Sequence, residues 1–185
     1  MKSTIFVGAV TPVPSHPRGL YRRGPDESEW QSLEAGLPAD LQVNCIVTGS
    51  GESNVLLIGT QRGVFRSEDH GDSWVDLDVP EECKPVYSLL IHPNAPTTIY
   101  AGSDDTVICR TNDNGASWRS LPTVQPKGAL TSCFPVRVLK MTMDPTNTDE
   151  MYAALEVGGV IRSLDGGESW DDISGGLLEL SEQPH

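Results

Sequence analysis

Hydrophobic residues in this chain occur in short runs, and turn-forming residues separate one run from the next. Residues 56–59, 86–91 and 136–141 are runs of this kind. Their length suits a β-strand and is too short for a helix. The chain also holds 18 glycines and 14 prolines, which supply the turns that many short strands need. The pattern therefore predicts an all-β protein.

The tryptophans mark a repeat along the chain. They are Trp30, Trp74, Trp118 and Trp170, spaced by 44, 44 and 52 residues. The last three each end the motif Arg-[Ser/Thr]-x-Asp-x-Gly-x-Ser-Trp, and such agreement at a regular interval indicates an internal repeat. The motif residues that follow the arginine are Ser67, Asp69, Gly71, Ser73 and Trp74; Thr111, Asp113, Gly115, Ser117 and Trp118; and Ser163, Asp165, Gly167, Ser169 and Trp170.

The chemistry of this motif is that of a tight connection between two antiparallel strands. The aspartates Asp69, Asp113 and Asp165 can accept hydrogen bonds from nearby backbone N–H groups, and the serine hydroxyl adds a further local bond. The glycine supplies a positive φ, and the tryptophan can pack its ring between neighbouring sheets. An acidic loop can also bind calcium or act in catalysis, but three similar turns at a regular period favour a structural role.

Further strands precede each motif. In the second copy a strand ending in arginine lies at residues 63–66, another at 56–59 and an apolar run at 43–47. With the strand that contains tryptophan, each repeat has four strands, which at a period of about 40–50 residues is typical of a β-propeller blade. The repeats divide a single propeller region at 1–185 into blades and a tail, at 1–34, 35–78, 79–122, 123–174 and 175–185.

The first copy of the repeat is incomplete. Strands are expected at residues 5–8 and 19–22, but only Trp30 remains of the motif, and no first strand precedes Ile5. We therefore expect a partial, truncated propeller, the amino-terminal part of a ring of about six to eight blades. A closed four-bladed ring, with residues 177–180 as the missing strand, is the alternative. An open blade edge would favour self-association.

Composition and charge exclude several classes of function. The net charge is −13, from 26 acidic and 13 basic residues, so nucleic acids and anionic membranes are not expected partners. No apolar run approaches the ~20 residues of a membrane helix, and the amino terminus resembles a strand more than a signal peptide. Cys45, Cys83, Cys109 and Cys133 lack metal-ligand spacing. We expect a soluble cytoplasmic protein with free thiols and no metal or cofactor.

The repeat resembles the Asp-box, or bacterial neuraminidase repeat, propellers. Their motif Ser-x-Asp-x-Gly-x-[Ser/Thr]-Trp stands here at residues 67–74 and 163–170, and at 111–118 with threonine in the first place. The group includes sialidases and other glycoside hydrolases, sortilin-type receptors and photosystem II assembly factors. The resemblance implies the fold and does not by itself imply an activity.

Two departures from the sialidases of this group argue against a sialidase activity. The sequence has no Arg-Ile-Pro motif. Sialidases also use an arginine triad to bind a carboxylate, but Arg22, Arg66, Arg110 and Arg162 occupy equivalent places in separate blades. They should radiate around the ring and bond within their own blades.

Strand order predicts which loops share a face of the ring. The second-to-third-strand loops and the connections between blades should meet on one face, opposite the box turns, and propellers usually bind ligands there or in the central channel. Its candidate residues are His16, Arg18, Arg62, Asp104, Asp105 and Glu156, with Glu81, Glu82, Lys84 and Lys127 in the connections. The stiff proline-rich loop around His16 could present a side chain to a partner, or could be a plain surface insertion. His92 lies in a turn equivalent to that of Asp144 and is expected to be structural.

The leading hypothesis is a non-catalytic scaffold that binds a protein or a small ligand, such as a carbohydrate, on this face. The alternative is a sialidase-like glycoside hydrolase with catalytic residues partly outside the chain. A glycosidase needs two carboxylates about 5–10 Å apart, and Asp104 with Glu156 of the next blade is the weak candidate pair. These residues can equally be solvated loop charges. A third possibility is a decayed reading frame with no independent role.

Overall fold

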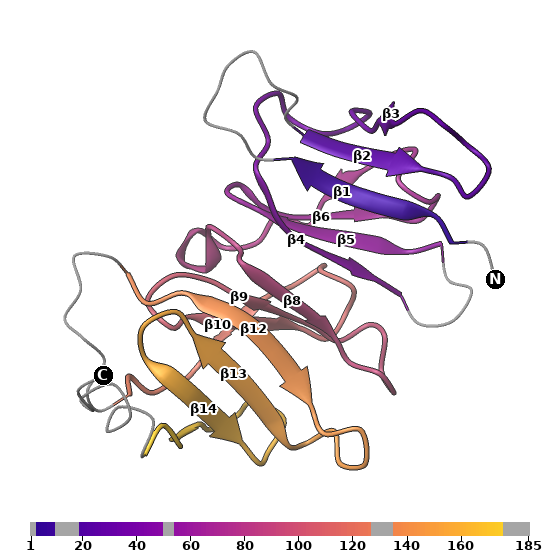
Figure 1. The fold of residues 1–185 in the computed structure, drawn as a ribbon. Helices are drawn as coiled ribbons and strands as arrows, with labels where there is room; N and C mark the ends of the chain where they lie inside the picture. The colour runs from indigo at the N-terminus through magenta and orange to yellow at the C-terminus, as the bar shows by residue number, and fades with distance from the viewer. Residues whose placement is uncertain (1–2, 10–18, 50–53, 127–134, 176–185) are drawn as a thin grey trace, which may run out of the picture.

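The computed structural model describes residues 3–9, 19–49, 54–126 and 135–175, and all of its sheet structure is antiparallel (Figure 1). Its first sheet contains β1 (Ile5–Ala9), β2 (Gly19–Arg23) and β3 (Gln31–Ser32). The second contains β4 (Val43–Thr48), β5 (Leu56–Thr60), β6 (Gly63–Ser67) and β7 (Val75–Asp76). The third contains β8 (Ser88–Ile91), β9 (Ile99–Gly102), β10 (Ile108–Thr111) and β11 (Arg119–Leu121). The fourth contains β12 (Val138–Met143), β13 (Met151–Leu155), β14 (Gly159–Ser163) and β15 (Asp171–Asp172).

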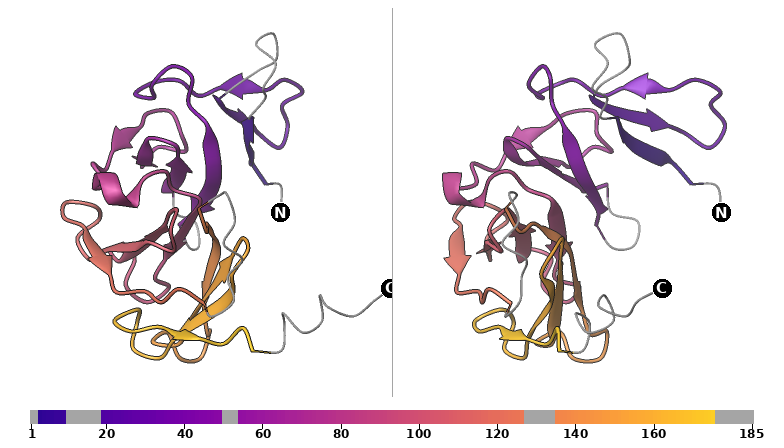
Figure 2. Two further views of the ribbon diagram at one scale, coloured as in Figure 1. Left: turned by 90° about the vertical axis from the view of Figure 1, so that its left-hand side faces the viewer. Right: turned by 60° about the vertical axis from the view of Figure 1, so that its left-hand side comes forward.

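These sheets are propeller blades, and we number them blades 1 to 4 in chain order. Blades 2, 3 and 4 are four-stranded meanders, whereas blade 1 has three described strands, of which β1 corresponds to the second strand of the other blades. The strands nearest the axis, β1 in blade 1 and the first strands β4, β8 and β12 of the other blades, lie side by side in that order, so the blades form an open row with blades 1 and 4 at its ends (Figures 1 and 2). The chain therefore forms part of an all-β propeller.

The hydrophobic core lies between the blades, in three seams. Each blade has a leading side, which faces the blade before it, and a trailing side, which faces the next blade. Because side chains alternate along a strand, Leu56 and Ile58 of β5 face blade 1 while Leu57 between them faces blade 3. The seam of blades 1 and 2 contains Leu20, Leu33, Leu41, Val43, Leu56, Ile58, Phe65 and Trp74. The seam of blades 3 and 4 contains Tyr100, Ile108, Leu121, Val138, Met141, Met151, Ala153, Ile161 and Trp170.

A glycine in the second strand lets adjacent blades approach closely. The position recurs as Gly8, Gly59 and Gly102, which lie beneath a valine of the following blade or of the connection that leads to it. A Cβ built on these glycines would lie 2.8, 2.7 and 2.6 Å from Val43, Val86 and Val138. A side chain larger than hydrogen would therefore push the blades apart. Blade 4 has the exposed Ala154 at this position.

A disulfide joins the connection between blades 2 and 3 to the outer half of blade 3. Cys83, in the short 3-10 helix η1 (Glu81–Cys83), pairs with Cys109 of β10 across a Cα–Cα distance of 6.2 Å. The expectation that these two thiols are free is therefore wrong, and the argument from them for a reducing compartment does not hold. Cys45 is free and partly buried, and burial raises the pKa of its thiol to about 11; Cys133 lies outside the described residues.

No helix within the described part of the chain is long and apolar enough to cross a membrane.

Candidate functional site

Each box turn is closed by its own polar side chains. In blade 2, the Asp69 carboxylate accepts hydrogen bonds from the Ser67 hydroxyl (2.8 Å), the Ser73 backbone N–H (2.9 Å) and the Ser73 hydroxyl (2.6 Å). The Ser67 hydroxyl oxygen in turn accepts the Gly71 N–H at 2.8 Å. Gly71 has φ +91°, a conformation that favours glycine.

The other two boxes repeat this network. Asp113 is held by Thr111 and Ser117, and Asp165 by Ser163 and Ser169. Hydrogen bonds from the serine that follows lower the pKa of each box aspartate to about 2. Gly115 and Gly167 have φ +93° and +91°. The box aspartates are therefore turn-builders, as the repeat predicts, and their oxygens are occupied within the turn. His92 and Asp144 likewise accept N–H bonds within their own turns.

The tryptophans of the repeats differ in burial. Trp74 and Trp170 are each only 4% exposed and donate their indole N–H to Gly71 and Gly167. Trp118 is partly buried and donates across the seam to the Leu77 carbonyl at 3.0 Å. Trp30 is 43% exposed, because it lies on the leading side of the first blade.

Three of the repeated arginines, Arg22, Arg66 and Arg110, join one blade to the next, so the expectation that each bonds within its own blade is wrong. Arg22 donates to the His70 carbonyl of the following box (2.8 Å) and forms an ion pair with Asp72 (2.8 Å). Arg66 donates to Asn114 at 2.6 Å. Arg110 donates to the Gly166 carbonyl at 3.1 Å and pairs with Glu168 at 2.7 Å. Arg22 and Arg66 also keep one partner in their own blade, Gln31 and Glu68. The arginines do not converge upon one ligand.

On the opposite face, which we call the loop face, the structure brings Asp104 and Glu156 to one guanidinium. Arg137 lies between them, with Nε 3.4 Å from an Asp104 oxygen and Nη1 3.4 Å from a Glu156 oxygen. Its guanidinium also stacks 4.8 Å from the ring centroid of Tyr87. Asp104 comes from the β9–β10 turn and Glu156 from the β13–β14 turn. The backbone bond from Glu156 N–H to the Arg137 carbonyl (2.9 Å) fixes the arginine beside its acid.

The electrostatics of this cluster depend on partial burial. Burial raises the pKa of Asp104, and the charge of Arg137 opposes that rise. Burial also raises the pKa of Tyr87, and the nearby Asp104 charge adds to it. Asp104 Oδ1 and Arg137 Nε are buried atoms without a hydrogen bond in the described part of the chain.

The turn that carries Asp104 is strained. Asp105 and Thr106 both have positive φ, 54° and 62°, and the Val107 N–H closes the turn on the Asp104 carbonyl at 3.0 Å. A β-branched residue at positive φ is a genuine outlier, and strain of this kind often accompanies functional sites. The Thr106 N–H donates across the seam to the Val136 carbonyl (2.9 Å), which holds the strained turn in place.

The remaining candidates are scattered. Arg62 lies in the β5–β6 turn, where its N–H donates to Thr60, and Arg62 is not among the partners of Arg137. Lys84 pairs with Glu81 within η1 and its connection. His16, Arg18 and Lys127 lie outside the described residues. Arg137 and Tyr87 were missed from the sequence; the only signal was a charged residue at the start of an apolar run.

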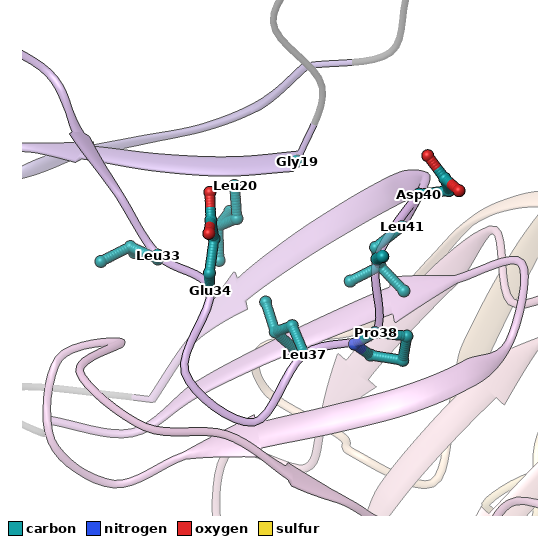
Figure 3. Close-up of a pocket in the computed structure, with 9 residues that line it drawn as sticks. Gly19, Leu20, Leu33, Glu34, Leu37, Pro38, Asp40 and Leu41 are labelled. Carbon is teal, nitrogen blue, oxygen red and sulfur yellow. The ribbon is translucent and has the colours of Figure 1, made fainter.

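A hollow of about 420 Å³ lies near the seam of blades 1 and 2 (Figure 3). Its apolar lining comes from the start of β2 and from the connection between β3 and β4, and includes Leu20, Leu33, Leu37, Pro38 and Leu41. Glu34 and Asp40 also line it and are exposed. These loops belong to the loop face. The described residues contain no group of three His, Cys, Asp or Glu side chains placed to hold a metal ion.

The fold and the box turns define an Asp-box β-propeller protein. Residues 62–175 match the Sortilin-Vps10 family, described as sortilin, neurotensin receptor 3. Because this match covers more than half of the chain, the chain belongs to the Sortilin-Vps10 family.

The similar proteins include two enzymes and a sorting protein. The oligoxyloglucan-reducing end-specific xyloglucanase of Emericella nidulans is 24% identical over 142 residues, 70% of this chain and 17% of that enzyme. The vacuolar protein sorting/targeting protein 10 of Schizosaccharomyces japonicus is 28% identical over 104 residues, 56% of this chain and 7% of that protein. The crystal structure of an ancestral GH74 enzyme superposes with a TM-score of 0.68 at 20% identity, over 85% of this chain and 21% of the enzyme. The chain thus spans about a fifth or less of each of these relatives.

Proposed function

We propose that this propeller region is a non-catalytic scaffold that binds a segment of a protein partner on the loop face. The observation that carries the proposal is the position of Arg137 between Asp104 and Glu156. A glycosidase needs one carboxyl group to donate a proton and another to act as nucleophile or base. The Arg137 guanidinium lies between the two acids, where a glycosidic bond would lie, and its charge opposes the rise in the pKa of Asp104 that burial causes.

The hollow near blades 1 and 2 suggests the chemistry of the ligand. Leu37 and Pro38 are the partly exposed apolar residues of its lining and can contact an aliphatic side chain, and the exposed Glu34 and Asp40 favour a positive charge beside that side chain. The net charge of −13 acts in the same direction over longer distances. A peptide that carries a leucine between lysines meets these conditions.

A glycoside hydrolase remains the second candidate because of the enzyme relatives and the paired acids. The xyloglucanase of Emericella nidulans and the GH74 structure share the fold at 24% and 20% identity. Asp104 and Glu156 come from adjacent blades and meet at one point, as an enzyme would require. In that case a substrate or a further part of the protein would have to displace Arg137.

Two titrations test the proposal. A Lys-Leu-Lys peptide should bind the chain by calorimetry, a Glu-Leu-Glu peptide should not, and Leu37→Asp should weaken binding of the former at least ~10-fold. Val75→Asp, at a residue 66% exposed on the outer strand of blade 2, is the matched control and should bind normally. Equal binding of both peptides, or no effect of Leu37→Asp, would contradict this ligand class.

Incubation with xyloglucan oligosaccharides separates the two candidate functions. The scaffold proposal expects no new reducing ends with the full chain. Turnover that disappears in both Asp104→Asn and Glu156→Gln would overturn the proposal in favour of the hydrolase.

A further inference from the structure

The three seams of this protein share one set of contacts. The residue three positions after each box tryptophan packs under the glycine of the next box, so that Leu33 meets Gly71, Leu77 meets Gly115 and Leu121 meets Gly167. The arginine of the trailing side donates to the next box turn in each seam. A trailing side and a leading side are therefore complementary surfaces, and the structure shows this three times.

The trailing side of blade 4 carries the same groups, and no described blade lies against it. Ile173 stands at the position of Leu33, Leu77 and Leu121 but is 38% exposed. Arg162 stands at the position of the seam arginines, opposite Tyr152 in the β13–β14 ladder.

The leading side of blade 1 is the other half of such a seam. Ile5, Val7 and Trp30 are 46%, 40% and 43% exposed. Their counterparts by register in blade 2 are Leu56, Ile58 and Trp74, all at most 4% exposed within a seam. An apolar surface of this kind on a sheet face marks an interaction site.

The two open sides also differ in charge. The trailing side of blade 4 presents Arg162. The turn next to Trp30 on the leading side of blade 1 contains the exposed acids Asp26, Glu27 and Glu29, and the Arg23 guanidinium stacks over the Trp30 ring, 4.8 Å from its centroid. In two internal seams, the arginine of one blade, Arg22 or Arg110, pairs with an acid in the box turn of the next blade. An arginine facing an acidic turn is therefore a feature of the seams within the chain.

We propose that the trailing side of blade 4 binds the leading side of blade 1 in a second copy of this chain. The contact is heterologous, because two different surfaces meet. Each copy has two open sides, the leading side of blade 1 and the trailing side of blade 4. If two copies bind each other through both sides, they close a ring of eight blades, which is within the range known for propellers. The interface would use Ile173, Val160 and Arg162 of one copy against Val7, Trp30 and the acidic turn of the other.

Light scattering after gel filtration, over a range of concentrations, tests this proposal. The full chain should move from 20.0 kDa towards about twice that mass as concentration rises. A trailing-side variant, Ile173→Asp/Arg162→Glu, and a leading-side variant, Val7→Asp/Trp30→Ser, should each stay monomeric. Val75→Asp, on an outer strand away from both sides, should associate like the parent chain. Circular dichroism and thermal melting establish that each variant is folded.

Mixing the two variants is the decisive measurement. Each retains one intact side, and the two intact sides are complementary, so an equimolar mixture should form a heterodimer of about 40 kDa through a single seam, with affinity at least ~10-fold below that of the parent dimer. A mixture that stays monomeric while the parent associates would overturn the proposal, since it would indicate a like-with-like contact. A parent chain that stays monomeric at its highest soluble concentration would also overturn it.

Discussion

The charge on each box aspartate is stabilised by donors that the turn itself supplies. In the folded chain the Asp113 carboxylate accepts bonds from the Ser117 hydroxyl and N–H and from the Thr111 hydroxyl. The pKa of Asp113 is therefore about 2, below its ordinary 3.8. A group whose pKa is lower in the folded state stabilises the fold above its unfolded pKa, and that contribution is lost as pH falls towards the folded value.

Replacement of Asp113 by Asn should destabilise the fold in a pH-dependent way. The difference in melting temperature between the parent and Asp113→Asn should be full above about pH 5 and should shrink between pH 4 and pH 2, where the parent carboxylate becomes protonated. Thermal melts monitored by circular dichroism across this range measure it. Glu82→Gln, at an exposed position in η1, is the control and should follow the parent curve. A pH-independent difference would mean that the side-chain shape, rather than the charge, closes the turn.

The contribution of the Arg137 cluster also falls as pH falls, although the pKa of its acid Asp104 is raised and not lowered. Burial raises the pKa of Asp104 above its ordinary value, so the charged carboxylate depends on Arg137 at neutral pH. Arg137→Met should lower the free energy of unfolding by about 1–2 kcal/mol at pH 7, a figure reduced because both side chains are partly exposed. The loss should become smaller at pH 4, because a protonated Asp104 no longer needs the cation. Chemical denaturation at the two pH values measures it, and Arg137→Met/Asp104→Asn should recover most of the stability at pH 7.

At the scale of the strand, the blades approach closely only because the second strand has a glycine, with no side chain, where it meets the next blade. A Cβ on Gly102 would lie 2.5 Å from the Ser88 hydroxyl and 2.6 Å from a Val138 methyl. Gly102→Ala should therefore cost about 1–3 kcal/mol through overpacking of the third seam. Ala154→Gly, the same position on the open side of blade 4, is the matched control and should cost at most about 1 kcal/mol, from backbone entropy alone. Equal costs at both positions, by urea denaturation, would show that the seam adapts to the extra methyl.

The strands and turns were predictable because their causes are local. The short apolar run at residues 56–59 and the bonds of the box turn depend on residues a few positions apart, so one copy of the repeat explains the others. The seams were not predictable in the same way. The repeat aligns Arg66 with Arg110, but it does not show that each reaches into the following blade, since that depends on how two sheets are rotated against each other. The pairing of Cys83 with Cys109 was missed for the same reason.

In the candidate site, too, the local features were predictable from the sequence and the contacts between blades were not. Strand order predicted that Asp104 and Glu156 would share the loop face, and the structure brings them together. Arg137 was missed because it occupies the start of an inner strand, where the pattern marks it only as one polar residue in an apolar run. Its partners come from blades 3 and 4, at sequence separations of 33 and 19 residues, which no local pattern connects.

At the scale of the whole molecule, stability is a sum over seams, and the blades do not share them equally. Blade 3 has a seam on each side and the Cys83–Cys109 disulfide. Blade 1 has one seam and three strands. In arrays whose units contact only their neighbours, a terminal unit with one interface opens more easily than a central unit with two.

Hydrogen exchange should therefore be graded along the row. In the trailing-side variant, which cannot associate, the amides of β1 and β2 should exchange at least ~10-fold faster than those of β9 and β10 when measured by mass spectrometry on peptides. In the parent chain at high concentration, β1 and β2 should gain protection, because the second copy covers their leading side. Uniform exchange in the monomeric variant would show that all four blades open as one cooperative unit. Blade 1 would then be as stable against local opening as blade 3, and association could not increase its protection relative to the other blades.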